Sequence, residues 1–180
     1  MALPKYPTEQ FPSSHFICGG SILFESTRAP LRVCLLHHNV RDEWLLPKGR
    51  KDRGEDVTVA TVRETFEETG SCERLPLNLI TWTPEAGAQT KDAAVPVPGS
   101  EEPFMLTLRS TEDAVVKFIW WFATVRMGED KVEGTQTAVE SFRSAAGGDV
   151  QVDREVIAMA VDLMRVMYYP VGSVESGGSS

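Results

Sequence analysis

Cysteine, positive charge and long apolar runs are all scarce in this sequence. The three cysteines, Cys18, Cys34 and Cys72, form no C-x-x-C pair, and two of them lie in apolar stretches, so we expect buried, reduced thiols. No stretch reaches the roughly 18 apolar residues of a membrane-spanning helix, and residues 1–14 lack the apolar core of a signal peptide. These absences predict an intracellular protein, cytoplasmic or nuclear, with no membrane partner.

Basic residues are outnumbered by acidic ones, with 18 Lys and Arg against 26 Asp and Glu and a formal net charge of −8. Sequence-independent binding to nucleic acid requires many cations opposite phosphates, so no extended nucleic-acid surface is expected. A small anionic ligand is compatible with this charge, because its pocket needs only local positive charge or a metal. The length of 180 residues, with 42% hydrophobic and 24% charged, predicts a single globular domain.

Turn-forming residues and apolar periodicity divide the chain into segments. We predict an N-terminal lead at 1–14, a domain at 15–170 with a long loop at 83–102, and a flexible tail at 171–180. β-Branched and aromatic residues predict strands at 15–26, 31–38, 72–82, 104–110 and 115–125, of which the last two form a hairpin. Helices are predicted from near 54–57 to Gly70, from the capping-box pair Thr137 and Glu140 to Gly147, and from Asp153 to Tyr168.

The helix that ends at Gly70 concentrates acidic residues on one side. At about 100° per residue, Glu64, Glu67 and Glu68 share one face. The opposite face, expected to be buried, carries Val59, Val62 and Phe66. Three neighbouring carboxylates raise one another's pKa unless a cation lies among them, and oxygen ligands suit Mg²⁺ or Mn²⁺. The alternative is an ordinary solvated helix face.

The residues around this helix form a longer pattern that weakens the alternative. From Gly49 to Ser71 the chain reads G-x5-E-x7-R-E-T-x-E-E-x-G-S, preceded by WLLPKG. This stretch resembles the Nudix box, G-x5-E-x7-R-E-U-x-E-E-x-G-U, where U is a bulky aliphatic residue. All seven fixed positions match, whereas Thr65 and Ser71 replace the two aliphatic residues. The resemblance implies an α/β (α+β) protein of Nudix fold, an α/β/α sandwich around a mixed β-sheet, that hydrolyses a diphosphate linkage with Mg²⁺ or Mn²⁺.

The resemblance also implies which groups would hold the metal. Glu67 and Glu68 would be the principal ligands, joined by the backbone carbonyl of Lys48. Glu64 would be a further ligand or the base that takes a proton from the attacking water. Many members of the family add one acidic residue from outside the box, and the candidates here are Glu112, Glu129, Glu133 and Glu140.

Other positions of the box would position the ligands. Arg63 would orient a helix carboxylate through a charge-assisted hydrogen bond, and Glu55 would support the loop or share in metal binding. Gly49 and Gly70 would permit backbone turns at the two ends of the box.

The substrate is suggested by a cluster of basic residues around the start of the box, namely Arg41, Lys48, Arg50, Lys51 and Arg53. The stretch LPKGRKDRGED resembles the branch of the family that handles diphosphoinositol and diadenosine polyphosphates, and a rim of cations would suit such small, highly charged substrates. An ordinary solvated surface is the alternative for these residues. The sequence leaves the oligomeric state open.

Aromatic residues are compatible with a nucleotide substrate, because an aromatic ring can stack on adenine. The candidates are Trp44, Trp82, Phe118, Trp120, Trp121 and Phe122, although aromatics in strands are commonly core residues. ADP-ribose and capped RNA are therefore alternative substrates, and a Nudix-fold module that senses a phosphorylated ligand without hydrolysis is an alternative class of function.

Overall fold

The structure of this chain is a computed structural model that describes residues 7–12, 14–70, 72–81, 87, 93–126 and 153–169, together with the backbone of 138–144. In these residues the elements in chain order are β1 (Phe16–Phe24), β2 (Arg32–His38), β3 (Glu43–Leu45), β4 (Lys48–Arg50), α1 (Val57–Thr69), β5 (Glu73–Arg74), β6 (Leu77–Thr81), β7 (Val95–Ser100), β8 (Met105–Ser110), β9 (Val116–Val125), β10 (Ala138–Ser144) and α2 (Arg154–Tyr168).

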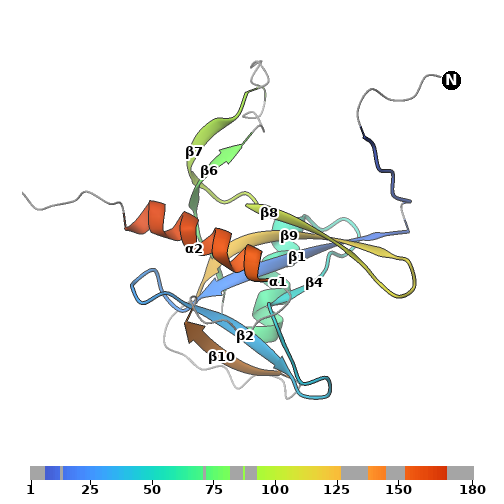
Figure 1. Cartoon of the computed structure of the whole chain (residues 1–180), viewed down its shortest axis with the longest axis horizontal. Coiled ribbons are helices and arrows are strands. Elements are labelled where there is room, and N and C mark those ends of the chain that lie inside the picture. The colour runs from blue at the N-terminus through green and yellow to red at the C-terminus, as the bar shows by residue number, and fades with distance from the viewer. Residues whose placement is uncertain are drawn as a thin grey trace, which may run out of the picture.

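Most of these strands form one mixed sheet. Its order is β10-β2-β1-β9-β5, and β3, β4 and β8 extend it by pairing with β2, β1 and β9. The central strands β1 and β9 run parallel, from Phe16 opposite Lys117 to Phe24 opposite Val125, whereas the other pairs are antiparallel. Figure 1 shows β1 and β9 side by side through the middle of the molecule. The predicted mixed sheet is confirmed.

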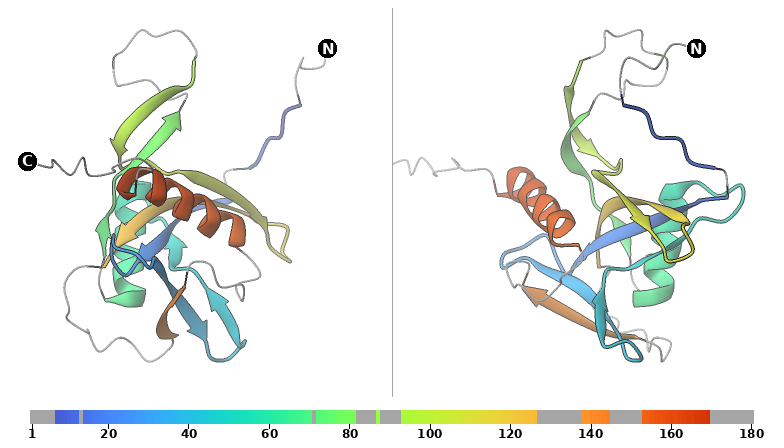
Figure 2. Two further views of the ribbon diagram at one scale, coloured as in Figure 1. Left: turned by 60° about the vertical axis from the view of Figure 1, so that its left-hand side comes forward. Right: turned by 45° about the vertical axis from the view of Figure 1, so that its right-hand side comes forward.

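The two helices lie on opposite faces of this sheet, as the views in Figures 1 and 2 show together. The larger core lies under α2, where Met164 and Val161 belong to the same buried cluster as Ile22 and Trp121. The predicted α/β/α arrangement is therefore confirmed. Successive residues of a strand point to opposite faces, so α1 lies on the face that bears the residues of β1 on either side of Ile22.

Several predicted elements are confirmed with small changes. The strands at 15–26 and 31–38 appear as β1 and β2, and those at 104–110 and 115–125 form the β8–β9 hairpin. The single strand predicted at 72–82 is two strands, because β5 pairs with β9 and β6 pairs with β7. Pro76 lies between them, and proline lacks the N–H that would continue a ladder.

The loop predicted at 83–102 was wrong for Val95–Ser100, which form β7. Val95 and Val97 alternate with prolines, which is compatible with a strand, but the abundance of Ala, Pro and Gly in this stretch indicated a loop. Prolines are tolerated because β7 pairs with β6 along one side, so the other side does not require their missing N–H groups. The rest of the predicted loop, 83–86 and 88–92, and the tail at 171–180 lie outside the described residues.

The short helix predicted from Thr137 to Gly147 was also wrong. Ala138–Ser144 form β10, which pairs with β2 over seven residues, from Ala138 opposite His38 to Ser144 opposite Arg32. The open edge of β2 supplies a ladder of backbone hydrogen bonds that a capping-box signal, which is local, cannot reveal.

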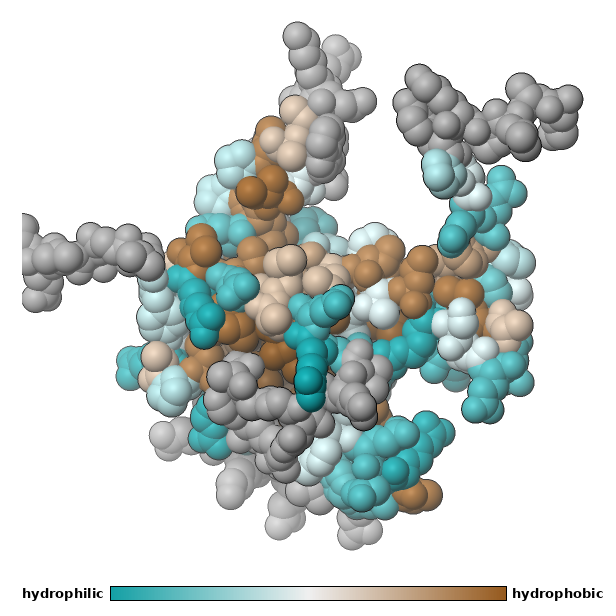
Figure 3. Space-filling view, in the orientation of Figure 1, coloured by the Kyte–Doolittle hydropathy of each residue, from teal (hydrophilic) through white to brown (hydrophobic). Residues whose placement is uncertain are grey.

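An apolar groove separates the β6–β7 hairpin from α2. Its volume is about 710 Å³, and its lining includes Ile80, Val97, Phe104, Met159 and Val166. Figure 3 shows apolar side chains gathered around the hairpin and along α2. The apolar lining comes from both elements. The β6–β7 hairpin, which alone would be marginally stable in water, therefore packs beside α2.

The buried face of α1 differs from the predicted one. Val59 and Phe66 are 57% and 55% exposed, so the apolar face predicted to be buried points to solvent. The residues that α1 buries are small: Ala60, Thr61, Thr65 and Thr69. The reason lies in the sheet, because a Cβ at Gly19 of β1 would lie 2.8 Å from the backbone nitrogen of Thr61. At such a close approach only small side chains fit between helix and sheet.

All three cysteines are buried thiols, as predicted. In the described part of the chain, no helix is long and apolar enough to cross a membrane.

Candidate metal and phosphate site

The position of α1 is fixed at both ends by its capping residues. Asp56 is the N-cap, and its Oδ1 accepts a hydrogen bond of 2.8 Å from the backbone N–H of Thr58. Gly70 ends the helix in the left-handed region, with φ of 74°, and its N–H donates to the carbonyl of Phe66 at 2.7 Å. The predicted role of Gly70 is confirmed, because a left-handed C-cap favours glycine.

The side of α1 that faces the sheet is polar but internally satisfied. Thr61, Thr65 and Thr69 each donate their hydroxyl to the carbonyl four residues earlier, at 2.9, 2.7 and 2.7 Å. Thr65 occupies one of the two aliphatic positions of the box and is fully buried. Its hydrogen bond removes the cost of burying a hydroxyl, so this departure from the box pattern leaves the helix intact.

Arg63 links the loop before the helix to the carboxylates on it. Its Nε and Nη2 donate to the two oxygens of Glu55 at 2.9 Å each, and Nη2 also donates to the carbonyl of Arg50 at 3.1 Å. Its Nη1 donates to Glu64 at 2.8 Å and to Glu67 at 3.4 Å. One guanidinium therefore contacts three of the acidic residues of the box.

The charges in this network reinforce one another. The hydrogen bonds from Arg63 and from the backbone N–H of Asp52 lower the pKa of Glu55 from 4.5 to about 2. In turn, the bonds to Glu55 and Glu64 raise the pKa of Arg63. Glu55 is thus held ionised, in a position that supports the loop.

Glu64 packs directly against Gly49 of β4. A Cβ at position 49 would overlap the carboxylate of Glu64, and no left-handed backbone is found at this glycine. The expectation that Gly49 permits a backbone turn was wrong: the residue lies within β4, and a side chain there would displace the carboxylate of Glu64.

The carboxylate of Glu68, a residue of α1, reaches the beginning of β4, where it accepts a hydrogen bond of 3.0 Å from the backbone N–H of Lys48. Protein atoms around the carboxylate reduce its hydration and raise its pKa from 4.5 to about 7, and Glu64 and Glu67 add to the rise. The side chain nevertheless remains exposed, so solvent screens part of this effect.

We expect this shift to make the stability of the metal-free protein depend on pH. Between about pH 4.5 and 7 the folded protein keeps a proton on Glu68 that the unfolded chain releases, so the free energy of unfolding falls as pH rises through this range. Because the group is exposed, the fall should stay below about 1 kcal/mol. Urea unfolding in a chelator, below and above this range, measures it, and Glu68→Gln should remove this part of the dependence. The same pH dependence in both proteins would contradict the prediction.

The structure separates the basic residues predicted to form a rim. Lys48 and Arg50 lie on β4, beside Glu68 and Arg63. Lys51 and Arg53 follow in the loop before α1, and the Nζ of Lys51 donates to the carbonyl of Asp52 at 2.8 Å. Arg41 lies elsewhere, in the turn between β2 and β3.

Two basic residues that sequence reasoning missed lie on the β8–β9 hairpin. Arg109 of β8 is directly opposite Lys117 of β9. The Nη2 of Arg109 donates to Oδ1 of Asp153 at 2.9 Å, which explains why Asp153, although it precedes α2 as predicted, makes no side-chain cap. The signal was available in the alternation of the hairpin, which puts Arg109 and Lys117 on one face.

The acidic candidates outside the box stay predictions. Glu112 lies in the turn between β8 and β9, and Glu140 lies on β10, whose side chains are not described. Glu129 and Glu133 lie outside the described residues.

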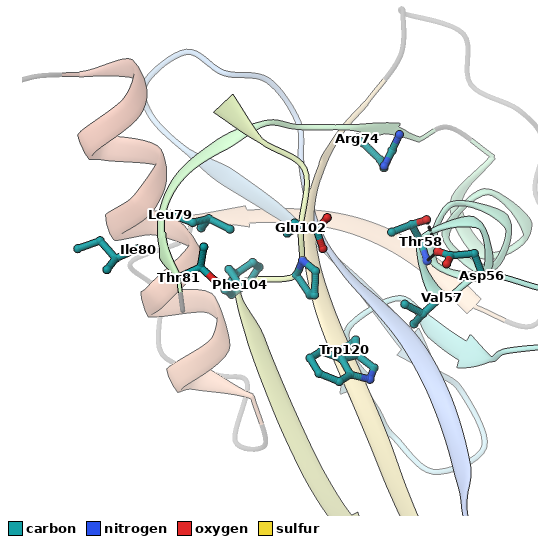
Figure 4. A pocket seen from close by; sticks show the side chains of 11 residues that line it. Asp56, Val57, Thr58, Arg74, Leu79, Ile80, Thr81, Glu102, Phe104 and Trp120 are labelled. Atoms are coloured by element: carbon teal, nitrogen blue, oxygen red, sulfur yellow. Dashed lines mark hydrogen bonds between the residues drawn. The ribbon is translucent and has the colours of Figure 1, made fainter. Parts of the chain in front are cut away.

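A pocket of about 780 Å³ lies on the α1 side of the sheet. Figure 4 shows the rings of Trp120 and Phe104 on the sheet side and Asp56 and Thr58 at the start of α1, with Arg74 above. A smaller pocket of about 630 Å³ shares Thr58 and Arg74 with it and reaches Arg63 and Glu67 of the box. Most of the smaller pocket lies on the exposed apolar side of α1, since its lining includes Val59, Val62 and Phe66.

The other aromatic candidates are engaged elsewhere. Trp121 and Phe122 are buried in the core, and Trp44 packs on His37 with ring centroids 4.6 Å apart. Phe118 makes an edge contact with Phe11. Trp82 lies outside the described residues.

The residues of the box fit a hard divalent cation by their chemistry. Glu64, Glu67 and Glu68 offer only oxygen donors, and the raised pKa of Glu68 marks a carboxylate that a cation would favour in its ionised form. As the side chains lie, no three acidic, histidine or cysteine groups among the described residues enclose a metal position. Glu64 and Glu67 turn to Arg63 instead, and the long contact of Glu67, at 3.4 Å, holds that exposed side chain only weakly.

A mixed sheet between two helices, with one helix presenting carboxylates that an arginine ties to the preceding loop, defines the class of Nudix-fold proteins. The family model of the NUDIX domain matches residues 20–135, which is well over half of the sequence. The chain belongs to the NUDIX domain family.

One curated relative is an 8-oxo-(d)GTP phosphatase of Mycolicibacterium smegmatis, which is 31% identical over 99 residues. The match covers 51% of this chain and 27% of that protein, so the chain corresponds to about a quarter of the relative's length.

Solved structures show the same fold at low identity. An Ap4A hydrolase of C. elegans in a binary complex has a TM-score of 0.59 at 14% identity, covering 84% of this chain and 98% of that one. A NUDIX-family hydrolase of Clostridium perfringens has a TM-score of 0.56 at 11% identity, covering 84% and 97%. The NUDIX domain of Shewanella oneidensis NrtR, complexed with ADP ribose, has a TM-score of 0.53 at 14% identity, covering 88% and 93%.

Proposed function

We propose that this chain is a divalent-metal-dependent hydrolase that cleaves a phosphoanhydride bond in a highly charged polyphosphate. The observation that supports the proposal is the arginine network of the box: Arg63 binds Glu55, Glu64 and Glu67, while Glu68 is held at the backbone of Lys48. All the carboxylates of the box are present, and they are positioned by hydrogen bonds that would be unnecessary on a solvated helix face.

The metal would be Mg²⁺ or Mn²⁺. Glu67 and Glu68 would be its principal ligands, with the carbonyl of Lys48 and, in one of its two candidate roles, Glu64. A divalent cation held there would neutralise phosphoryl oxygens and lower the pKa of bound water.

The side chains of the box have separate roles in the proposed reaction. Water adds to one phosphorus, the bridging P–O bond breaks, and the leaving phosphate departs with the bond electrons. Glu64 takes the proton of that water or, if it serves as a ligand instead, the proton passes to the surrounding solvent. Arg63 positions Glu64 and Glu67 without touching the substrate, and Glu55 positions Arg63.

A diphosphoinositol polyphosphate or a dinucleoside polyphosphate is the proposed substrate class. Lys48 and Arg50 support it, because the backbone of β4 contacts Glu68 and Arg63, and the charge of Glu68 acts on Lys48. Strong local positive charge favours a substrate with several phosphates over a singly linked sugar nucleotide.

A nucleotide substrate is the second candidate. The pocket that contains Trp120 and Phe104 favours it, because it offers rings for a base and shares Thr58 and Arg74 with the pocket that reaches Arg63 and Glu67. The names of the relatives include 8-oxo-(d)GTP and Ap4A, which are nucleotides.

A sensing module of Nudix fold is the alternative that lacks hydrolysis. The ADP-ribose complex of the NrtR domain shows a related fold holding such a ligand. Against this alternative stands the complete set of box carboxylates, since binding alone does not require all of them.

The proposal is tested by incubating the protein and Mg²⁺ or Mn²⁺ with a diphosphoinositol polyphosphate, diadenosine tetraphosphate, 8-oxo-dGTP, ADP-ribose and capped RNA. We expect release of phosphate from the inositol compound or cleavage of the diadenosine compound, detected by chromatography. In Glu67→Gln, turnover should fall at least about 100-fold, because a metal ligand is lost.

The outcomes separate the candidates. Preferred cleavage of 8-oxo-dGTP or ADP-ribose, reduced in Trp120→Ala, would favour the nucleotide candidate. Binding of a compound without metal-dependent cleavage of any would favour the sensing module and contradict the proposed hydrolysis.

A further inference from the structure

Four basic side chains lie on the face of the sheet that α2 covers, and two of them belong to β4, whose backbone contacts Glu68 and Arg63 of the box. Strand pairing puts Arg109 opposite Lys117, and Lys117 opposite Phe16. Lys48 and Arg50 pair with β1 at positions an even number of residues from Phe16, so their side chains share its face. Only one of these strands, β4, belongs to the box, and the other two basic residues come from a hairpin far along the sequence.

Shared contacts with Phe16 and mutual charge effects show that these side chains form one cluster. The Nζ of Lys117 lies 5.4 Å from the ring centroid of Phe16, and the Cζ of Arg50 lies 5.7 Å from the same centroid. Lys48 is close enough to Arg109 and Lys117 for their charges to act on it. The guanidinium of Arg109 is oriented by Asp153, whose side chain is 5% exposed.

The cluster is unfavourable for the protein alone. Like charges directly opposite on neighbouring strands destabilise a sheet, and Arg109 and Lys117 form such a pair. At Lys48 the charges of Arg109 and Lys117 are opposed by those of Glu68 and Asp153, so the four basic residues of the cluster face two acidic ones. On a chain with net charge −8, this local excess of positive charge is what a multivalent anion would neutralise.

We propose that Lys48, Arg50, Arg109 and Lys117 bind the part of the substrate that is not cleaved, and that this part is a densely phosphorylated, non-aromatic group. The inference rests on the proposed function and chooses within its substrate class. Guanidinium and ammonium donors match phosphate oxygens. The ring of Phe16 is engaged by two cations, so it supports them and does not stack on a base.

The test measures binding of inositol hexakisphosphate, which has many phosphates and no phosphoanhydride bond to cleave. Isothermal titration calorimetry in a chelator makes the readout independent of metal and turnover. Lys117→Gln and Arg50→Gln should each raise the dissociation constant about tenfold, because each removes a charge-assisted contact. The matched control is Arg28→Gln, which removes an exposed arginine from the β1–β2 connection and should bind like the unmodified protein. Lys117→Arg, which keeps the charge, should recover most of the affinity.

The results distinguish this inference from the proposed hydrolysis. If the unmodified protein fails to bind the probe, or if Lys117→Gln and Arg50→Gln bind it as Arg28→Gln does, the inference is overturned even where a nucleotide is hydrolysed. If binding depends on Lys117 and Arg50 while no substrate is cleaved with metal, the phosphate-binding face stands and the proposed hydrolysis is overturned.

Discussion

Replacing Arg63 with lysine is expected to reduce metal-dependent turnover by about 10- to 100-fold, the range typical of residues that position metal ligands. Lysine keeps the positive charge but cannot donate to both oxygens of Glu55 and at the same time to Glu64. Glu64 and Glu67 would then lose their fixed orientation, although every carboxylate is still present.

The readout for Arg63→Lys is kcat together with the Mg²⁺ concentration at half-maximal rate, measured on whichever compound the unmodified protein cleaves. Arg32→Lys is the matched control, because Arg32 pairs with Glu25, outside the box, at 3.1 Å. Equal turnover in Arg63→Lys and Arg32→Lys would contradict a positioning role for the guanidinium.

Gly19→Ala is expected to lower the free energy of unfolding by about 1 to 3 kcal/mol, as overpacking of a close contact does. The new methyl group would lie 2.8 Å from the backbone nitrogen and 2.9 Å from the Cα of Thr61. Backbone atoms cannot rotate away as a side chain can, so α1 must move from the sheet.

Urea unfolding measures this change, and a second substitution identifies its cause. Thr61→Ala in the Gly19→Ala background removes the contacting hydroxyl but leaves the backbone nitrogen and Cα in place, so it should restore only part of the stability. Full stability in Gly19→Ala alone would show that α1 does not lie this close to β1.

The sequence predicted the box and most of the sheet because both depend on local patterns. The box pattern identified Arg63 and the helix carboxylate Glu64 that it contacts, although not its pairing with Glu55, and the apolar runs identified β1, β2, β8 and β9. The failures have a different origin. The strand β10 exists because β2 has an edge to pair with, and Arg109 and Lys117 become neighbours through a hairpin register that composition does not encode.

The orientation of α1 failed for a related reason. Helical periodicity separates an apolar side from a polar side, and the apolar side was assigned to the core. In the structure, the glycine of β1 admits only small residues, so threonines face the sheet and Val59 and Phe66 face solvent. Which face is buried is decided by the shape of the partner surface, and that surface is formed by another segment.

The close packing of α1 on the sheet fixes the distance between the carboxylates of the helix and β4. Gly19 and Thr61 define this packing near one end of the helix, and Gly49 with Glu64 defines it in the middle. Related sequences should therefore keep glycine at 19, where backbone atoms of residue 61 fill the space, whereas a side chain at 49 should accompany loss of the carboxylate at 64. This pattern of substitutions would show that related proteins preserve the spacing of the site, whatever substrate each of them binds.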